Sequence, residues 1–167
     1  MESKEIIELC LKHTLFSWSA TGKVDPLPVS RAEGVYFYSP DGKRWLDFNS
    51  QLMSVNSGHG HPHVVKAIQK QAETLCYAGP SMATEIRAKL GKRLAGLVPG
   101  DINTFFFTLG GAEANENAIK AARRFTGRQK IMVRYRSYNG ATHGVMSLTG
   151  DPRRLPNEPG MAGVVRV

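Results

Sequence analysis

The stretch "TFFFTLGGAEANENAIKAARRF", residues 104–125, constrains the fold more than any other part of the chain. A short apolar run stops at two adjacent glycines, and a helix pattern rich in small residues, amides and carboxylates follows directly. A run this short and this apolar predicts a strand that is buried on both faces, as in a parallel sheet. Because "GRQKIMVRY" supplies another strand pattern after the helix, the sequence predicts a βαβ unit.

The Gly110-Gly111 step lies where such a unit binds ligands. Outside the carboxyl end of a parallel strand, the next helix presents unpaired backbone N–H groups and the positive end of its dipole. Glycines can adopt positive φ and let an anion, with phosphate as the best candidate, approach the main chain. The stretch matches neither the Walker loop nor the dinucleotide loop. On this local pattern alone, a plain tight turn is an equally good interpretation.

The remaining patterns predict helices over about 3–16, 62–75 and 84–97, and the last residues resemble the start of a new strand. Asp41-Gly42, between "GVYFY" and "RWLDF", predicts a β-hairpin. His59, His61 and His63 invite a metal interpretation. Gly60 and Pro62 disfavour the regular strand that would align the three imidazoles, so we expect no metal site here.

Composition narrows the class of protein. With 41% hydrophobic and 22% charged residues, the chain has the balance of a globular protein, and no apolar segment predicts a signal peptide or a membrane span. We therefore expect a cytoplasmic protein without a membrane partner. The net charge of +8 is not interleaved with stacking aromatic residues or joined to a nucleic-acid motif, so no nucleic-acid partner is expected. Cys10 and Cys76 lie far apart, which favours reduced thiols.

Several segments together resemble one family. "LGGAEANENAIKAARRFTGRQKI" is similar to the cofactor-phosphate segment of the class III (ω-amino acid) aminotransferases, which bind pyridoxal 5′-phosphate on the fold type I scaffold. "GVYFYSPDGKRWLDFNSQLMSVNSGHGHPHVVKAIQKQ" resembles their N-terminal hairpin, substrate-side loop and next helix, and "YRSYNGATHG" resembles their Tyr-x-Gly loop. The resemblance implies an α/β fold with an N-terminal α+β segment, residues 1–57, and the first, incomplete part of the large cofactor-binding domain, residues 58–167.

The resemblance also implies roles for the residues that match the cofactor motifs. The backbone N–H groups of Gly111 and Ala112 would hold the cofactor phosphate, with Gly110 allowing the turn. Tyr138 would stack on the pyridine ring, for which an aromatic face is suited. Gly140 would leave room beside that ring.

On the substrate side, the resemblance places Leu52 and Met53 on the loop that borders the substrate pocket and Trp18 on the same wall. The family often has a histidine after the stacking tyrosine, whereas this chain has Asn139. That difference leaves the stacking role of the tyrosine intact but weakens any argument for ring-edge or substrate contacts from position 139.

The implied activity is transfer of an amino group from a small-molecule donor, such as an ω-amino acid, to a keto acid. The family works as a homodimer with active sites at the subunit interface. Its Schiff-base lysine and the aspartate that protonates the pyridine nitrogen lie later in its chains, so we expect no catalytic residue here, a truncated chain and no turnover by it alone. A non-catalytic interaction fragment, or a mutase or epimerase of the same fold, remains an alternative.

Overall fold

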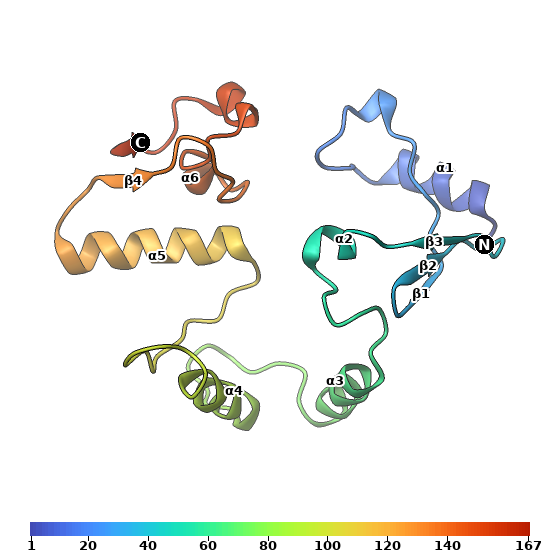
Figure 1. Cartoon of the computed structure of the whole chain (residues 1–167), viewed down its shortest axis with the longest axis horizontal. Coiled ribbons are helices and arrows are strands. Elements are labelled where there is room, and N and C mark those ends of the chain that lie inside the picture. The colour runs from blue at the N-terminus through green and yellow to red at the C-terminus, as the bar shows by residue number, and fades with distance from the viewer. The chain divides into compact units, whose positions relative to one another are not determined.

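The computed structural model describes residues 1–167, except for the side chain of Thr21. The chain divides into two compact units, Met1–Met82 and Ala83–Val167 (Figure 1). The division expected between residues 57 and 58 concerns the domains of the whole fold, and it stays a prediction.

A small antiparallel sheet organises the first unit. Its three strands lie in the order β1-β2-β3, namely β1 (Arg31–Glu33), β2 (Tyr36–Tyr38) and β3 (Arg44–Leu46). The predicted hairpin is confirmed, because Phe37 pairs with Trp45 across β2 and β3 and their rings stack 5.6 Å apart. Gly42 lies in the connecting turn with a φ of 82°, which only glycine adopts readily.

The first unit also contains, in chain order, α1 (Ser3–His13), the 3₁₀ turn η1 (Thr21–Lys23), α2 (Ser50–Met53) and α3 (Pro62–Thr74). Pro62 occupies the first turn of α3, where its missing N–H group would have no helical partner in any case. Helices α1 and α3 confirm the helices predicted near 3–16 and 62–75, although each ends slightly earlier than predicted.

The second unit contains α4 (Glu85–Ala95), α5 (Gly111–Thr126), β4 (Ile131–Val133), α6 (His143–Met146), the 3₁₀ turn η2 (Pro152–Asn157) and β5 (Val164–Arg166). Strands β4 and β5 pair in parallel, with Met132 opposite Val165. Ile119, Val145 and Leu148 are buried together, and apolar side chains of both strands pack against them. The core of this unit thus joins α5, α6 and the parallel pair.

Residues 102–109 differ from the prediction of a buried strand. The described backbone forms no ladder there, and Phe106 and Leu109 are 75% and 101% exposed. A strand needs a hydrogen-bonded neighbour, and no described residue supplies one to this segment. The parallel pair is instead β4 with β5, so the predicted βαβ unit through residues 102–109 is not formed within this chain.

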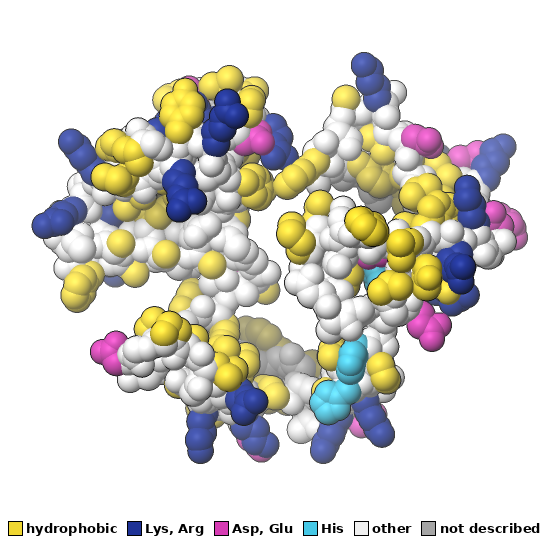
Figure 2. All heavy atoms as spheres, in the orientation of Figure 1, with side chains coloured by type: hydrophobic (Ala, Val, Ile, Leu, Met, Phe, Trp, Pro, Cys, Tyr) yellow, Lys and Arg dark blue, Asp and Glu magenta, His cyan; other side chains and the backbone are white. Residues whose placement is uncertain are grey.

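Large apolar side chains remain exposed on both units (Figure 2). Phe48 and Phe125 are 93% and 94% exposed, although single domains of this length usually bury such residues. No helix in the described part of the chain combines the length and the apolar character needed to cross a membrane.

Candidate functional site

The sequence predicts an anion-binding site at the Gly110-Gly111 step, which lies at the start of α5. Gly110 immediately precedes the helix with φ of −170° and ψ of 172°, and Gly111 is its first residue. Because this is extended backbone that any residue adopts, the expected positive φ at the glycine step is wrong. The glycines instead leave room, since a Cβ atom built on either one would meet no atom within 4 Å.

The first turn of α5 presents unused hydrogen-bond donors. The Ala114 N–H already donates to the Gly110 carbonyl, 3.0 Å away, and no side chain caps the helix from position 110. No described residue accepts from the N–H groups of Gly111 and Ala112. Together with the positive end of a 16-residue helix, these donors form a site suited to an anion.

The loop that carries Tyr138 packs against this helix start. A Cβ atom on Gly140 would come within 2.7 Å of the Ala112 Cβ and of the Val145 side chain, and Gly140 has a φ of 140°. Asn115 adds a hydrogen bond from its Nδ2 to the Asn139 carbonyl, 2.8 Å away. Position 140 therefore needs glycine for both its conformation and its close approach to Ala112.

Asn139 anchors the same loop through hydrogen bonds of its side chain and its backbone. Its Nδ2 donates to the Ser137 Oγ at 3.0 Å and to the Leu148 carbonyl at 3.1 Å. Its backbone N–H donates to the Thr149 Oγ1 at 3.1 Å, and Thr149 is fully buried. The side chain that stands where the family often has histidine thus anchors the loop, a role that the sequence pattern did not indicate.

Glu116 is a further residue that sequence reasoning missed. Its Oε1 accepts hydrogen bonds from the Thr142 Oγ1 at 2.7 Å and from the Val145 N–H at 3.1 Å. The carboxylate therefore caps the N-terminus of α6 from the second turn of α5. Gly144 passes so close that a Cβ atom there would lie 2.7 Å from the same Oε1. No local signal could reveal this contact, because it joins residues 26 and 29 positions apart.

Tyr138 lies at an open hollow of about 620 Å³ and is 49% exposed. The Arg153 guanidinium lies over its ring, 5.4 Å from the centroid, which is a cation–π contact. Asp151 fixes that guanidinium through contacts of 2.7 and 2.8 Å. Hydrogen bonds from the Arg153 side chain and backbone lower the pKa of Asp151 to about 2, so the pair stays ionised.

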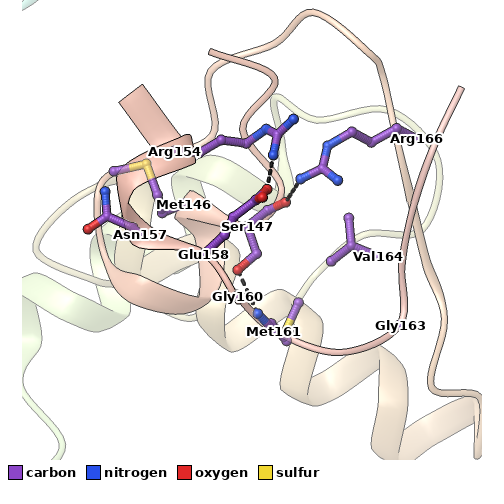
Figure 3. A pocket seen from close by; sticks show the side chains of 10 residues that line it. All are labelled: Met146, Ser147, Arg154, Asn157, Glu158, Gly160, Met161, Gly163, Val164 and Arg166. Carbon is purple, nitrogen blue, oxygen red and sulfur yellow. Dashed lines mark hydrogen bonds and ion pairs between the residues drawn. The ribbon is translucent and has the colours of Figure 1, made fainter. Parts of the chain in front are cut away.

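A smaller hollow of about 160 Å³ lies among α6, η2 and β5 (Figure 3). Arg154 forms an ion pair with Glu158, and the Arg166 Nη2 donates to the Ser147 carbonyl at 2.5 Å. The Ser147 Oγ accepts from the Met161 N–H at 2.7 Å. These contacts tie β5 to α6, and they involve none of the residues that the sequence assigns to the cofactor.

The expected substrate-side residues belong to the first unit. All four residues of α2 have positive φ, between 49° and 63°, so α2 is a left-handed turn. Leu52 and Met53 lie on it with 64% and 72% exposure. Trp18 also has a positive φ, of 65°, and is 59% exposed. Nothing in "SQLM" indicates a left-handed turn, because the segment contains no glycine.

The three histidines of "HGHPH" have different surroundings. The His59 Nε2 lies 2.7 Å from the Asp47 Oδ2, whereas His61 precedes α3 and His63 lies on it. Among the described side chains there is no group of three or more histidine, cysteine, aspartate or glutamate residues that could hold a metal ion.

Comparison with known proteins decides the family. Residues 18–166 match the family model described as aminotransferase class III. This chain belongs to the class III aminotransferases. An uncharacterized aminotransferase of Archaeoglobus fulgidus is 36% identical over 98% of the chain, which covers 39% of that relative.

Solved structures of other aminotransferases show the same fold. The taurine:2-oxoglutarate aminotransferase from Bifidobacterium kashiwanohense, solved with PLP and glutamate, is 41% identical with a TM-score of 0.93. An (S)-enantioselective omega-transaminase from Thermomicrobium roseum is 32% identical with the same TM-score. Both matches cover all of this class III chain but only 38% and 40% of the solved chains. The predicted fold type I, represented by part of its length, is thus confirmed.

Proposed function

We propose that these residues form the phosphate-binding and ring-stacking part of an aminotransferase that uses pyridoxal 5′-phosphate. The complete enzyme would move an amino group from a small amino donor to a keto acid. One observation carries the proposal: unused N–H donors at the start of α5 lie directly beside the Gly140 backbone of the loop that bears Tyr138.

The phosphate fits the start of α5 on three grounds. The N–H groups of Gly111 and Ala112 have no acceptor among the described residues, and the helix dipole favours a negative charge at this end. The missing side chains of Gly110 and Gly111 leave open space in front of the backbone. We assign the phosphate to these donors.

Tyr138 would contact the pyridine ring of the cofactor. Its ring is half exposed, and Arg153 lies over it. Asn139 and Gly140 hold the backbone of this loop beside the phosphate donors. When bound, the cofactor would supply the aldehyde that takes up the amino group and the ring that stabilises negative charge at the donor carbon.

Leu52 and Met53, with Trp18, would form an apolar wall of the donor pocket, which suits an ω-amino donor. The covalent lysine and the acid at the pyridine nitrogen would come from elsewhere in a longer chain, so we assign no catalytic residue here.

We further propose a cytoplasmic homodimer as the working form. The relatives described above are aminotransferases or transaminases, and they lend no support to the interaction fragment, mutase or epimerase alternatives.

The test is a titration of pyridoxal phosphate into the full-length protein carrying Gly111→Asp, followed by cofactor absorbance. The new carboxylate would enter the phosphate space and repel the anion. An acidic residue in the first turn of a helix is favoured by the dipole, so folding should be preserved. We expect the dissociation constant to rise by about 100-fold, which corresponds to loss of about 2.7 kcal/mol of phosphate binding.

Gly91→Asp is the matched control. Gly91 lies in α4, and a Cβ atom there would also meet nothing within 4 Å. This variant adds the same charge to a helix without approaching the assigned site, so cofactor affinity should stay at the wild-type value. Equal affinity of the Gly111→Asp and wild-type proteins would remove the phosphate assignment.

A further inference from the structure

The left-handed turn of α2 is an unusual conformation for its sequence. Ser50, Gln51, Leu52 and Met53 have φ values of 51°, 49°, 57° and 63°, and none of them is glycine. L-amino acids disfavour this region because the Cβ atom approaches the following carbonyl oxygen. A run of four such residues persists only where the surrounding structure fixes it, and strain of this kind gathers at functional sites.

Backbone hydrogen bonds close the turn but do not explain its hand. The Met53 N–H donates to the Asn49 carbonyl at 2.9 Å, and the Ser54 N–H donates to the Ser50 carbonyl at 2.8 Å. A right-handed turn would make the same i to i−4 bonds without the steric penalty. The side chains of Leu52 and Met53 are largely exposed, so packing of these residues does not hold the turn either.

The Asn49 Oδ1 accepts from the Leu52 N–H at 3.4 Å, and a shorter side-chain contact with the turn comes from Asp47. Its carboxylate side chain is only 3% exposed, and its Oδ1 accepts from the Gln51 N–H at 3.1 Å. Its Oδ2 lies 2.7 Å from the His59 Nε2, and the His59 side chain is 14% exposed. The carboxylate thus links the middle of the left-handed turn to a nearly buried histidine.

His59 is itself fixed to the sheet. Its N–H donates to the Gly34 carbonyl at 2.8 Å and its carbonyl accepts from the Gly34 N–H at 2.9 Å. Gly34 lies between β1 and β2, while Asp47 directly follows β3. The series Gly34, His59, Asp47 and Gln51 therefore ties the turn to one end of the small sheet, where the connection between β1 and β2 meets the end of β3.

The charge on Asp47 strengthens this connection. Burial of the carboxyl by itself raises its pKa, but hydrogen bonds from His59 and Gln51 outweigh burial and lower the pKa below its usual value. The carboxylate is therefore ionised at neutral pH, and an ionised acceptor binds N–H donors more strongly than a neutral one.

We propose that Asp47 and His59 are positioning residues that hold α2 left-handed and so set how Leu52 and Met53 meet the amino donor. The inference rests on the proposed function, in which those two side chains border the donor pocket. Neither Asp47 nor His59 contacts the donor. They act through the direction in which the turn projects its apolar side chains, and thereby on the size of donor that is accepted.

The test compares two donors in the full-length enzyme with pyruvate as acceptor. β-Alanine is short, while 1-phenylethylamine carries a ring that would reach the apolar wall. In Asp47→Ala and His59→Ala we expect kcat/KM for 1-phenylethylamine to fall about tenfold or more, with less than about a threefold change for β-alanine, since small misplacement of a pocket wall is enough for such a loss. His59→Gln should restore the ratio, because its amide can donate to Asp47.

His63→Gln is the matched control, because His63 lies in the same "HGHPH" segment and no contact with Asp47 is described for it. It should leave the donor ratio unchanged. Gln51→Gly in the Asp47→Ala background should recover part of the ratio, since glycine adopts positive φ without the penalty. A side chain that only stabilised the fold would lower both donor rates together and would not respond to glycine at position 51.

Hydrogen exchange at the Leu52 and Met53 amides gives a readout without activity. Exchange there should become at least about tenfold faster in Asp47→Ala and stay near wild type in His59→Gln. If Asp47→Ala does not fold, the comparison of His59→Ala with His59→Gln carries the test. An active wild type whose His59→Ala variant keeps both the donor ratio and the exchange rates would overturn the inference. A wild type that neither binds cofactor nor transaminates would instead overturn the proposed function. The hydrogen exchange at Leu52 and Met53 would still test whether Asp47 and His59 hold the turn.

Discussion

At the scale of single residues, Gly140 is where the candidate cofactor site tolerates least change. Its φ of 140° is unfavourable for any residue with a Cβ atom, and that atom would lie 2.7 Å from Ala112 and Val145. We expect Gly140→Ala to lower the free energy of unfolding by about 3 kcal/mol, from overpacking and backbone strain together. Urea denaturation of the full-length protein measures this change.

Gly91→Ala provides the comparison for that substitution. Gly91 lies within α4, has no positive φ and has open space where a Cβ atom would go. Alanine there should be neutral or stabilise the protein by up to about 1 kcal/mol. Similar denaturation midpoints for the two variants would show that position 140 is not as closely packed as described.

The sequence could predict the roles of some residues but not of others. The location of the glycine step and of Tyr138 followed from local patterns and from the family resemblance. The role of Asn139 in anchoring its loop, and that of Glu116 in capping α6, did not, because each depends on partners that are distant in sequence. The pairing of Asp47 with His59 was hidden for the same reason, although the histidine itself was conspicuous.

At the scale of elements, the longer helices and the local hairpin of β2 and β3 were predicted well, whereas the pairing of strands that lie far apart in the sequence was not. Apolar periodicity and terminal residues such as Pro62 mark α3 and α5 locally. A strand depends on a neighbour that its own sequence does not contain, so the apolar run 102–109 predicted a strand for which these residues provide no partner. The handedness of α2 was equally beyond the pattern, because it is fixed by Asp47 from outside the turn.

Residues 104–108 give a direct test at this scale. In the 167-residue chain alone, their amide hydrogens should exchange at close to unprotected rates, because no ladder shields them. Amides within α5, whose hydrogen bonds are internal, should exchange more slowly in the same sample. Mass spectrometry after timed exchange resolves the two segments. Strong protection of 104–108 in this chain would contradict the description of the segment as unpaired.

At the scale of the whole molecule, two features concern the length of the chain and its exposed apolar surface. It spans about two-fifths of the length of its matched relatives. Phe48, Leu109 and Phe125 are almost fully exposed, and apolar surface of this extent is normally covered by other protein. We propose that the remainder of a longer class III aminotransferase, and a second copy of it, cover these side chains.

We propose that the start of α5 and the Tyr138 loop together hold the phosphate and ring of pyridoxal phosphate. A crystal structure of the cofactor-loaded full-length protein tests it most directly. We predict phosphate oxygens within about 3 Å of the N–H groups of Gly111 and Ala112, which is the usual length of such hydrogen bonds, and the pyridine ring against the ring of Tyr138. A phosphate bound elsewhere, with the first turn of α5 in contact with solvent alone, would remove the phosphate from the Gly111 and Ala112 donors.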